Sequence, residues 1–180
     1  MIGISEQQLL EWLNPILWPF LRCLALFAGM PLFSQRNLPM PVRIGLALFF
    51  AVAAQASLPV IPPLPLDAPG LMLLLVAQQL LIGLAMGFAV RLAFAALEFA
   101  GEVVGLQMGL NFAGFFDPAT GSQGTATARF FGTLVAFLFV ASNGHLLLIE
   151  ALAQSFQRFP VGPEPFAFLT AAQPQVWGAE

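Results

Sequence analysis

Three long stretches of the sequence contain no charged residue, and they constrain the fold more than any other feature. They cover residues 44–66, 68–90 and 130–149. Each is long enough to cross a bilayer as a helix, which takes about 20 consecutive apolar residues. Hydrophobic residues make up 59% of the chain and charged residues only 8%, against roughly 25% in soluble domains. So few charges cannot coat a soluble surface, and we therefore predict an all-α membrane protein with long hydrophobic helices and hairpins.

Two further apolar segments are weaker candidates for membrane helices. The segment 12–33 is interrupted by Arg22, and the segment 161–177 contains Glu164 and several prolines. Proline disrupts helix interiors, so Pro15 and Pro19 predict breaks in the first of them. A cluster of prolines between residues 58 and 70 likewise predicts a connector rather than a helix.

The segment 71–116 contains no proline. A continuous helix over all of it would be about 69 Å long at 1.5 Å per residue. The hydrocarbon core of a bilayer is only about 30 Å thick. Either the segment folds back on itself or one helix projects well beyond the bilayer.

Charged residues form a stripe on this otherwise apolar segment. Arg91, Glu98 and Glu102 fall within about 40° of one another on a helix. Glu98 and Glu102 are four residues apart and repel by a few tenths of a kcal/mol when unpaired. We therefore expect these three residues to make polar contacts with another subunit.

Small residues recur on the same segment at helical spacing. Gly83 and Gly87 form one pair four residues apart, and Gly101 and Gly105 form another. Such spacing lets helix backbones approach closely, and it predicts helix packing at these four positions. The alternative is that glycine is simply frequent in membrane helices.

Residues 109–124 are rich in glycine and phenylalanine and cannot form one regular helix. Asp117 and Pro118 favour a turn, and Thr125 or Thr127 is suited to cap a following helix. The segment is therefore a loop between two helices. It is either a surface loop or a constriction, because irregular backbone at membrane depth must line a cavity or be buried in protein.

Composition excludes several classes of function. All six basic residues are arginines, the net charge is −3, and no basic patch is present, so we expect no nucleic-acid binding. The single cysteine, Cys23, lies far in sequence from the single histidine, His145. We expect no metal ion, no cofactor and no catalytic site.

Five runs resemble one known family and occur in the family's order. They are residues 41–48 (Pro-Val-Arg-Ile-Gly-Leu-Ala-Leu), 82–91 (Ile-Gly-Leu-Ala-Met-Gly-Phe-Ala-Val-Arg), 100–109 (Ala-Gly-Glu-Val-Val-Gly-Leu-Gln-Met-Gly), 116–121 (Phe-Asp-Pro-Ala-Thr-Gly) and 142–149 (Ser-Asn-Gly-His-Leu-Leu-Leu-Ile). Together they resemble the FliR/SctT family of type III export gate subunits, and the flagellar FliR branch more than the virulence branch.

The resemblance implies a function and a set of partners. It implies a subunit of the flagellar type III protein export gate, in the bacterial inner membrane at the flagellar basal body. Such a subunit helps to form and plug the channel for unfolded export substrates. The implied partners are FliP and FliQ, with FlhB and FlhA, the unfolded flagellar export substrates and the lipid bilayer.

The resemblance also implies a plug in the irregular loop. The channel-plug residues would be Leu110, Asn111, Phe112, Phe115 and Phe116, and the plug hinges would be Gly109, Gly114 and Gly121. Family members continue with further apolar helices. Residues 1–180 are therefore expected to form a single membrane-embedded export-gate domain that lacks the family's C-terminal helices.

The sequence leaves three alternative functions. The first is a virulence secretion homologue of the SctT kind, and the second is a stand-alone transporter or channel that uses the charged stripe as an ion pathway. Transporters usually contain internal repeats, and none is evident here. An intramembrane hydrolase built on His145 with Ser142 or Ser155 is the third alternative, but the sequence shows no set of nucleophile, base and orienting group.

Overall fold

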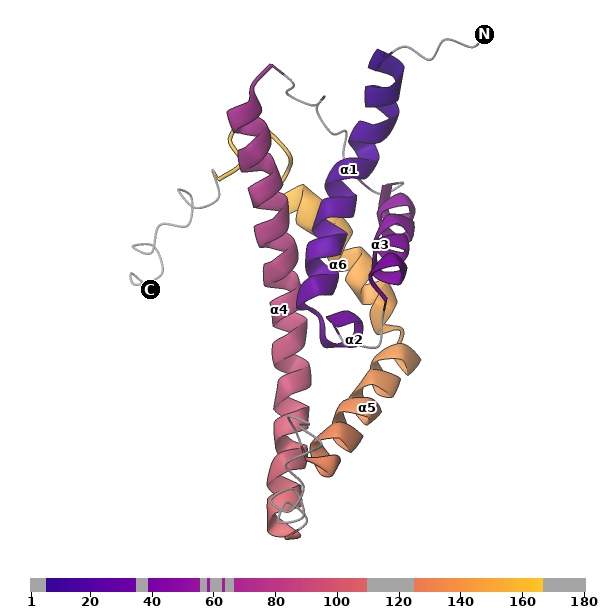
Figure 1. Cartoon of the computed structure of the whole chain (residues 1–180), viewed down its shortest axis with the longest axis vertical. Helices are drawn as coiled ribbons and strands as arrows, with labels where there is room; N and C mark the ends of the chain where they lie inside the picture. Colours follow the sequence, from indigo (N-terminus) through magenta and orange to yellow (C-terminus); the bar gives the residue numbers. More distant parts are fainter. Residues whose placement is uncertain are drawn as a thin grey trace.

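A computed structural model describes residues 6–34, 39–55, 58, 63, 67–109 and 125–166. Within these ranges all regular elements are α-helices: α1 (Glu6–Gly29), α2 (Pro31–Ser34), α3 (Met40–Gln55), α4 (Pro69–Gln107), α5 (Ala126–Ala141) and α6 (Gly144–Arg158). The long α4 packs against α1 along its upper half and against α5 near its lower end (Figure 1). The predicted all-α membrane fold is confirmed.

Helix α1 continues through both of its prolines. Pro15 and Pro19 lie inside α1, so the prediction of breaks at these two positions is wrong. Proline is tolerated in membrane helices because neighbouring helices and polar side chains satisfy the freed backbone groups. Other prolines do lie at helix starts, where no backbone N–H is needed: Pro31 opens α2 and Pro69 occupies the first turn of α4.

Helix α3 covers only part of the charge-free stretch 44–66. It ends at Gln55 and is 16 residues long, which is shorter than the about 20 residues that cross a bilayer. Its buried face consists of Ala47, Ala51 and Ala54. These small side chains let α3 lie close to α1, against which it packs.

Helix α4 is continuous over 39 residues, which corresponds to about 58 Å. Of the two alternatives for this segment, the structure shows a single long helix from Pro69 to Gln107 and no fold-back within that range. Such a helix is longer than the hydrocarbon core is thick.

Helices α5 and α6 divide the charge-free stretch 130–149, which was predicted to be one membrane-length helix. The two helices are bent by 70° at their junction. Asn143 lies at this junction with φ of 58°, in the left-handed region, which asparagine tolerates better than most residues. Thr125 caps the N-terminus of α5, because its hydroxyl accepts a hydrogen bond of 3.2 Å from the backbone N–H of Ala128. The predicted cap at Thr125 is confirmed.

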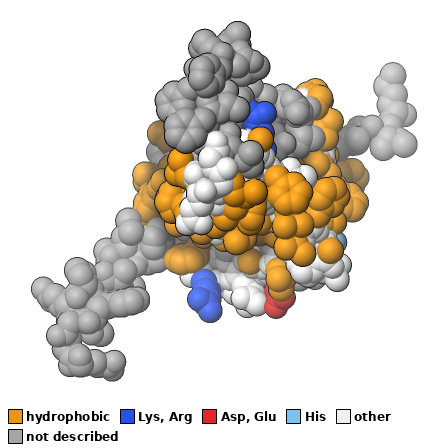
Figure 2. Space-filling view, turned by 90° about the horizontal axis from the view of Figure 1, so that it is seen from below, with side chains coloured by type: hydrophobic (Ala, Val, Ile, Leu, Met, Phe, Trp, Pro, Cys, Tyr) orange, Lys and Arg blue, Asp and Glu red, His pale blue; other side chains and the backbone are white. Residues whose placement is uncertain are grey.

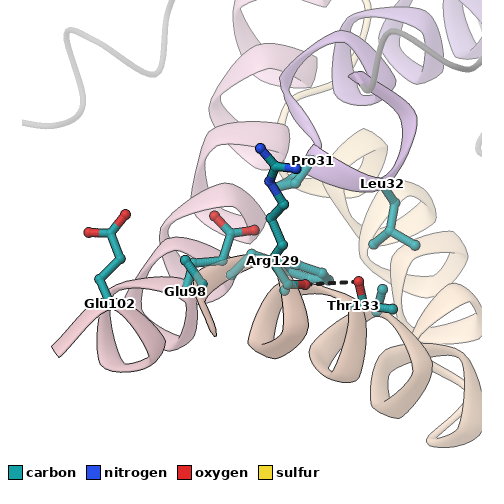
Figure 3. A pocket seen from close by; sticks show the side chains of 10 residues that line it. Pro31, Leu32, Glu98, Glu102, Arg129 and Thr133 are labelled. Atoms are coloured by element: carbon teal, nitrogen blue, oxygen red, sulfur yellow. Dashed lines mark hydrogen bonds between the residues drawn. The ribbon is translucent and has the colours of Figure 1, made fainter. Parts of the chain in front are cut away.

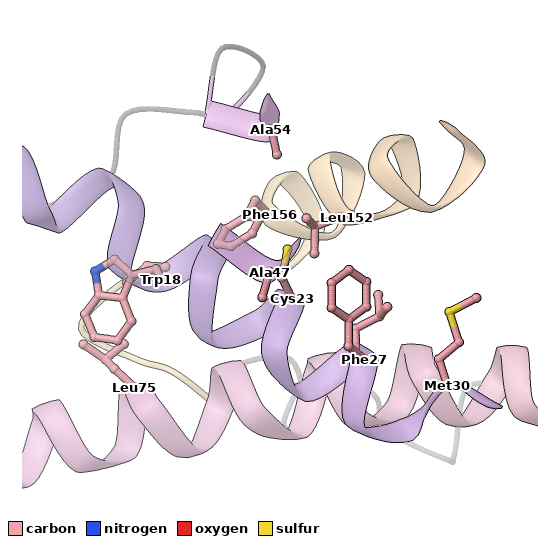
Figure 4. Close-up of a cluster of buried hydrophobic side chains, with 11 residues drawn as sticks. Trp18, Cys23, Phe27, Met30, Ala47, Ala54, Leu75, Leu152 and Phe156 are labelled. Atoms are coloured by element: carbon pink, nitrogen blue, oxygen red, sulfur yellow. The ribbon is translucent and has the colours of Figure 1, made fainter. Parts of the chain in front are cut away.

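Two helices of the described part are long and apolar enough to cross a membrane. They are the portion 12–29 of α1 and the whole of α4, and the bent pair of α5 and α6 adds a third if it is counted as one span. A cluster of buried side chains, seen in Figure 4, joins α1 to α4 and α6. It includes Trp18, Cys23 and Phe27 from α1, Leu75 from α4 and Phe156 from α6.

Candidate functional site

The upper half of α4 meets α1 through glycines. A Cβ atom added at Gly83 would clash with the carbonyl oxygen of Arg22, and one added at Gly87 would lie 2.5 Å from the carbonyl oxygen of Leu26. Gly29 faces Gly87 from α1, with its own added Cβ only 3.2 Å from the Gly87 backbone. The backbones of the two helices therefore touch, which is the arrangement that small residues permit in membranes.

The lower half of α4 meets α5 through glycines that face side chains of the other helix. A Cβ atom added at Gly101 would lie 2.9 Å from the ring of Phe131, and one added at Gly132 of α5 would lie 2.8 Å from a carboxylate oxygen of Glu98. Gly105 is also buried on this face of α4. The four glycines singled out in the sequence thus share one buried face of α4, with α1 above and α5 below.

A charged pocket of about 400 Å³ lies where α2, α4 and α5 meet. Glu98 and Glu102 line it from α4, and Pro31 and Leu32 line it from α2. Arg129 extends from α5 toward Pro31, and its carbonyl oxygen accepts a hydrogen bond of 2.9 Å from the Thr133 hydroxyl (Figure 3).

This pocket brings together opposite charges that are distant in sequence. Arg129 lines the same pocket as the two carboxylates. The pocket therefore contains a basic residue of this chain as well as the two acidic residues for which we predict contacts with another subunit. Arg91 lies exposed on α4 and is not among the residues that line the pocket.

The proposed plug lies outside the described residues. Leu110, Asn111, Phe112, Phe115 and Phe116 belong to this part of the chain, as do the predicted hinges Gly114 and Gly121. Gly109 is described, and it follows α4 with φ of +71°. A left-handed glycine is a common helix terminator, because it turns the chain without the steric penalty of a Cβ atom.

Sequence reasoning missed the role of Arg22, which it treated only as an interruption of an apolar segment. The side chain of Arg22 is fully buried. Its Nε donates to Oε1 of Gln79 in α4 at 2.8 Å, and one terminal nitrogen donates to Oγ of Ser155 in α6 at 2.7 Å. The available signal was the arginine itself, since an ionisable residue within a membrane helix needs specific partners.

The serine candidates for a hydrolase are engaged in structural hydrogen bonds. The Ser155 hydroxyl accepts from Arg22 and donates to the carbonyl oxygen of Leu152 at 2.6 Å. The Ser142 hydroxyl donates to the carbonyl oxygen of Phe139 at 3.3 Å. In the described part of the chain, no three His, Cys, Asp or Glu side chains gather in a way that could hold a metal ion.

Exposed apolar side chains occur along nearly the whole length of α4, and the exposed Arg91 lies among them. We call this surface the outer stripe, and it includes Leu73, Leu80, Leu84, Phe88, Leu92, Phe99 and Leu106, all exposed. Seen from below, the described surface is also mostly hydrophobic, with few charged side chains (Figure 2). Exposed apolar surface of this extent marks contact with lipid or with other protein.

The helices and this surface define the class of the protein as a helical integral membrane protein. Its sequence matches the family described as bacterial export proteins, family 1, over residues 13–177. The chain belongs to this family of export proteins.

Relatives in the family carry the name flagellar biosynthetic protein FliR. The chain is 44% identical to the FliR of Escherichia coli (strain K12) over 92% of this chain and 62% of the relative. It is 39% identical to that of Pectobacterium carotovorum over 96% of this chain and 67% of the relative. It is 34% identical to that of Bacillus subtilis (strain 168) over 84% of this chain and 61% of the relative. The chain thus spans about two thirds or less of their length.

Proposed function

We propose that this chain is a subunit of the flagellar type III protein export gate in the bacterial inner membrane, at the flagellar basal body. Its membership of the export family and its relatives named FliR support the proposal. In this role the chain helps to form a channel for unfolded flagellar export substrates and carries out no chemical reaction.

The length of the outer stripe is the observation that carries the proposal. From Leu73 to Leu106 the stripe extends about 50 Å at 1.5 Å per residue. Membrane helices tilt by up to about 40°, which lets a core of about 30 Å cover roughly 39 Å of helix. At this tilt about 10 Å of apolar helix lies beyond the hydrocarbon, and contact with other protein chains would cover it.

The distribution of charge suggests which end of α4 those chains cover. Residues 68–90 are free of charge and match the thickness of a bilayer, whereas Arg91, Glu98 and Glu102 follow in the lower half. We propose that this lower half lies between subunits. FliP and FliQ are the proposed neighbours, with FlhB and FlhA also part of the apparatus. A basic side chain of a neighbour would be complementary to the acidic residues Glu98 and Glu102.

The loop that follows α4 is the proposed plug. Hydrophobic constrictions close channels by excluding water, and Phe112, Phe115 and Phe116 supply apolar side chains for such a constriction. Gly109 already has a left-handed backbone conformation, so it can redirect the chain at the start of this loop. Gly114 and Gly121 would provide similar freedom within and after it.

A complementation experiment tests the proposed function. The full-length product of the gene that encodes this chain is expressed in a flagellated bacterium that lacks its own FliR, and secretion of flagellar subunits into the medium is measured. Restored secretion is expected. Correct membrane insertion without any secretion, in a host whose own FliR restores it, would contradict the assignment to the flagellar gate.

A further inference from the structure

The surroundings of Arg22 join three helices around one buried charge. Besides its bonds to Gln79 and Ser155, Arg22 donates through its second terminal nitrogen to the carbonyl oxygen of Phe159 at 3.1 Å. Its guanidinium carbon lies 3.6 Å from the centre of the Phe156 ring. All three guanidinium nitrogens and one face of the group are therefore in contact with protein.

No carboxylate balances this charge among the described residues that contact it. A buried guanidinium without compensation is strongly destabilising, so the compensation must come from elsewhere. Ser155, Phe156 and Phe159 all belong to the C-terminal end of α6, and Phe159 is the capping residue of that helix. A helix C-terminus carries a partial negative charge and unpaired carbonyl groups, both of which suit a cation.

A second layer of amides extends the contact from α4. Gln79 donates to the side-chain oxygen of Gln78 at 3.0 Å, and Gln78 in turn donates to the carbonyl oxygen of Pro160 at 3.5 Å. Gln78 and Gln79 are both buried in an otherwise apolar helix. Arg22 and Gln78 thus bind the carbonyl oxygens of two successive residues at the end of α6, Phe159 and Pro160.

We propose that Arg22 is a polar clasp that fixes the C-terminal end of α6 to α1 and α4, with the end of α6 taking the place of an acidic side chain. Helix association in lipid gains little from apolar burial, so a polar contact of this kind selects one arrangement of helices. The clasp also explains how α6 keeps its direction after the bend at Asn143. It is independent of the proposed function.

The clasp depends on the shape of arginine and not on positive charge alone. The planar guanidinium offers donors in a fixed fork and stacks on an aromatic ring, whereas a lysine ammonium is a single point charge. Arg22→Lys retains the charge but cannot reach Gln79, Ser155 and Phe159 together. Losing one hydrogen bond to a charged group changes an equilibrium by about tenfold or more.

The native Cys23 reports on the state of the clasp. It is the single cysteine of the sequence, it is 2% exposed, and it packs in the cluster that includes Leu152 and Phe156 of α6. The rate at which N-ethylmaleimide labels Cys23 in membranes, normalised to labelling in SDS, therefore measures how often α6 separates from α1. Arg158→Lys, at an exposed arginine of the last turn of α6, is the matched control.

We expect slow labelling in the wild type and in Arg158→Lys, and a rate at least about tenfold higher in Arg22→Lys. Ser155→Ala removes the bond from Arg22, together with the bond from Ser155 to the Leu152 carbonyl oxygen, without changing charge, and it should raise the rate as well. If Arg22→Lys does not accumulate in the membrane, Ser155→Ala still tests the proposal. Wild-type rates in the inserted Arg22→Lys or Ser155→Ala chain would overturn the proposal, as would an equal increase in Arg158→Lys.

Discussion

The backbone of Gly83 in α4 lies directly against the carbonyl oxygen of Arg22 in α1. This contact leaves no room for a side chain at position 83 between the two helices. It also lies beside the buried guanidinium of the same arginine, which bonds to Gln79 one turn earlier on α4. The close backbone contact between α1 and α4 and the polar clasp therefore lie side by side, both at Arg22.

Gly83→Ala should lower the stability of the chain. Alanine is the better helix former by about 1 kcal/mol, but its methyl group would clash with the Arg22 oxygen and force α1 away from α4. We expect a net loss of about 1–3 kcal/mol, typical of overpacked sites. Thermal unfolding of the detergent-solubilised chain provides the measurement. Gly45→Ala on α3, where nothing lies within 4 Å of the added Cβ, is the control and should retain or raise the wild-type Tm.

Like Gly83, Asn143 is a position where the backbone restricts which residues are tolerated. Its left-handed φ of 58° costs an ordinary side chain about 1–2 kcal/mol. Asn143→Val should therefore lower the Tm of the chain, whereas Asn143→Gly should leave it unchanged or raise it. An equal Tm for the two variants would show that the bend between α5 and α6 does not require this conformation.

The sequence predicted the class of fold but not where the helices break. Scarcity of charge was sufficient for the all-α membrane fold. The absence of proline permitted the long α4 but did not decide between one long helix and a fold-back, which the structure decides. The stretch 130–149 was uniformly apolar, and its hydropathy concealed the bend at Asn143. Pro15 and Pro19 instead predicted helix breaks that do not occur. Their local helix-breaking tendency is overridden by packing of α1 against α3 and α4.

The clasp could not be predicted because its members are distant in sequence. Arg22 bonds to groups 57, 133 and 137 residues away. Spacing within one helix carries no information about such contacts. The stripe of Arg91, Glu98 and Glu102 could be predicted because its members lie on one helix, where helical periodicity places them on one face. Only the fold shows that Arg129 of α5 lines the same pocket as Glu98 and Glu102.

Replacing both Glu98 and Glu102 with glutamine should weaken assembly with the neighbouring subunits. The change removes the negative charge that we propose for recognition of a basic side chain while it retains the size of both residues. The measurement is the amount of FliP and FliQ recovered with the affinity-tagged full-length protein. Glu150→Gln, at an exposed carboxylate of α6 that bonds to Gln154, is the control and should recover normal amounts. Normal recovery with the double variant would rule out the intersubunit role.

Replacing Phe112 and Phe116 with alanine should make the inner membrane permeable to ions while export continues. Smaller side chains would let water fill the proposed constriction, and ions would follow. Ion-dependent growth or a membrane-potential dye provides the measurement in cells that express the assembled gate. Phe137→Ala, at an exposed phenylalanine of α5, tests whether loss of any phenylalanine has this effect. Unchanged permeability in the double variant would remove the plug assignment.

Co-purification tests the central claim most directly. The affinity-tagged full-length protein, inserted in the membrane and solubilised in mild detergent, is purified from cells that also express FliP and FliQ. If the outer stripe of α4 is covered by neighbouring subunits, all three proteins will elute together as one stable complex. Recovery of the inserted protein alone, in a form that conducts ions by itself, would contradict the assignment and favour a stand-alone channel.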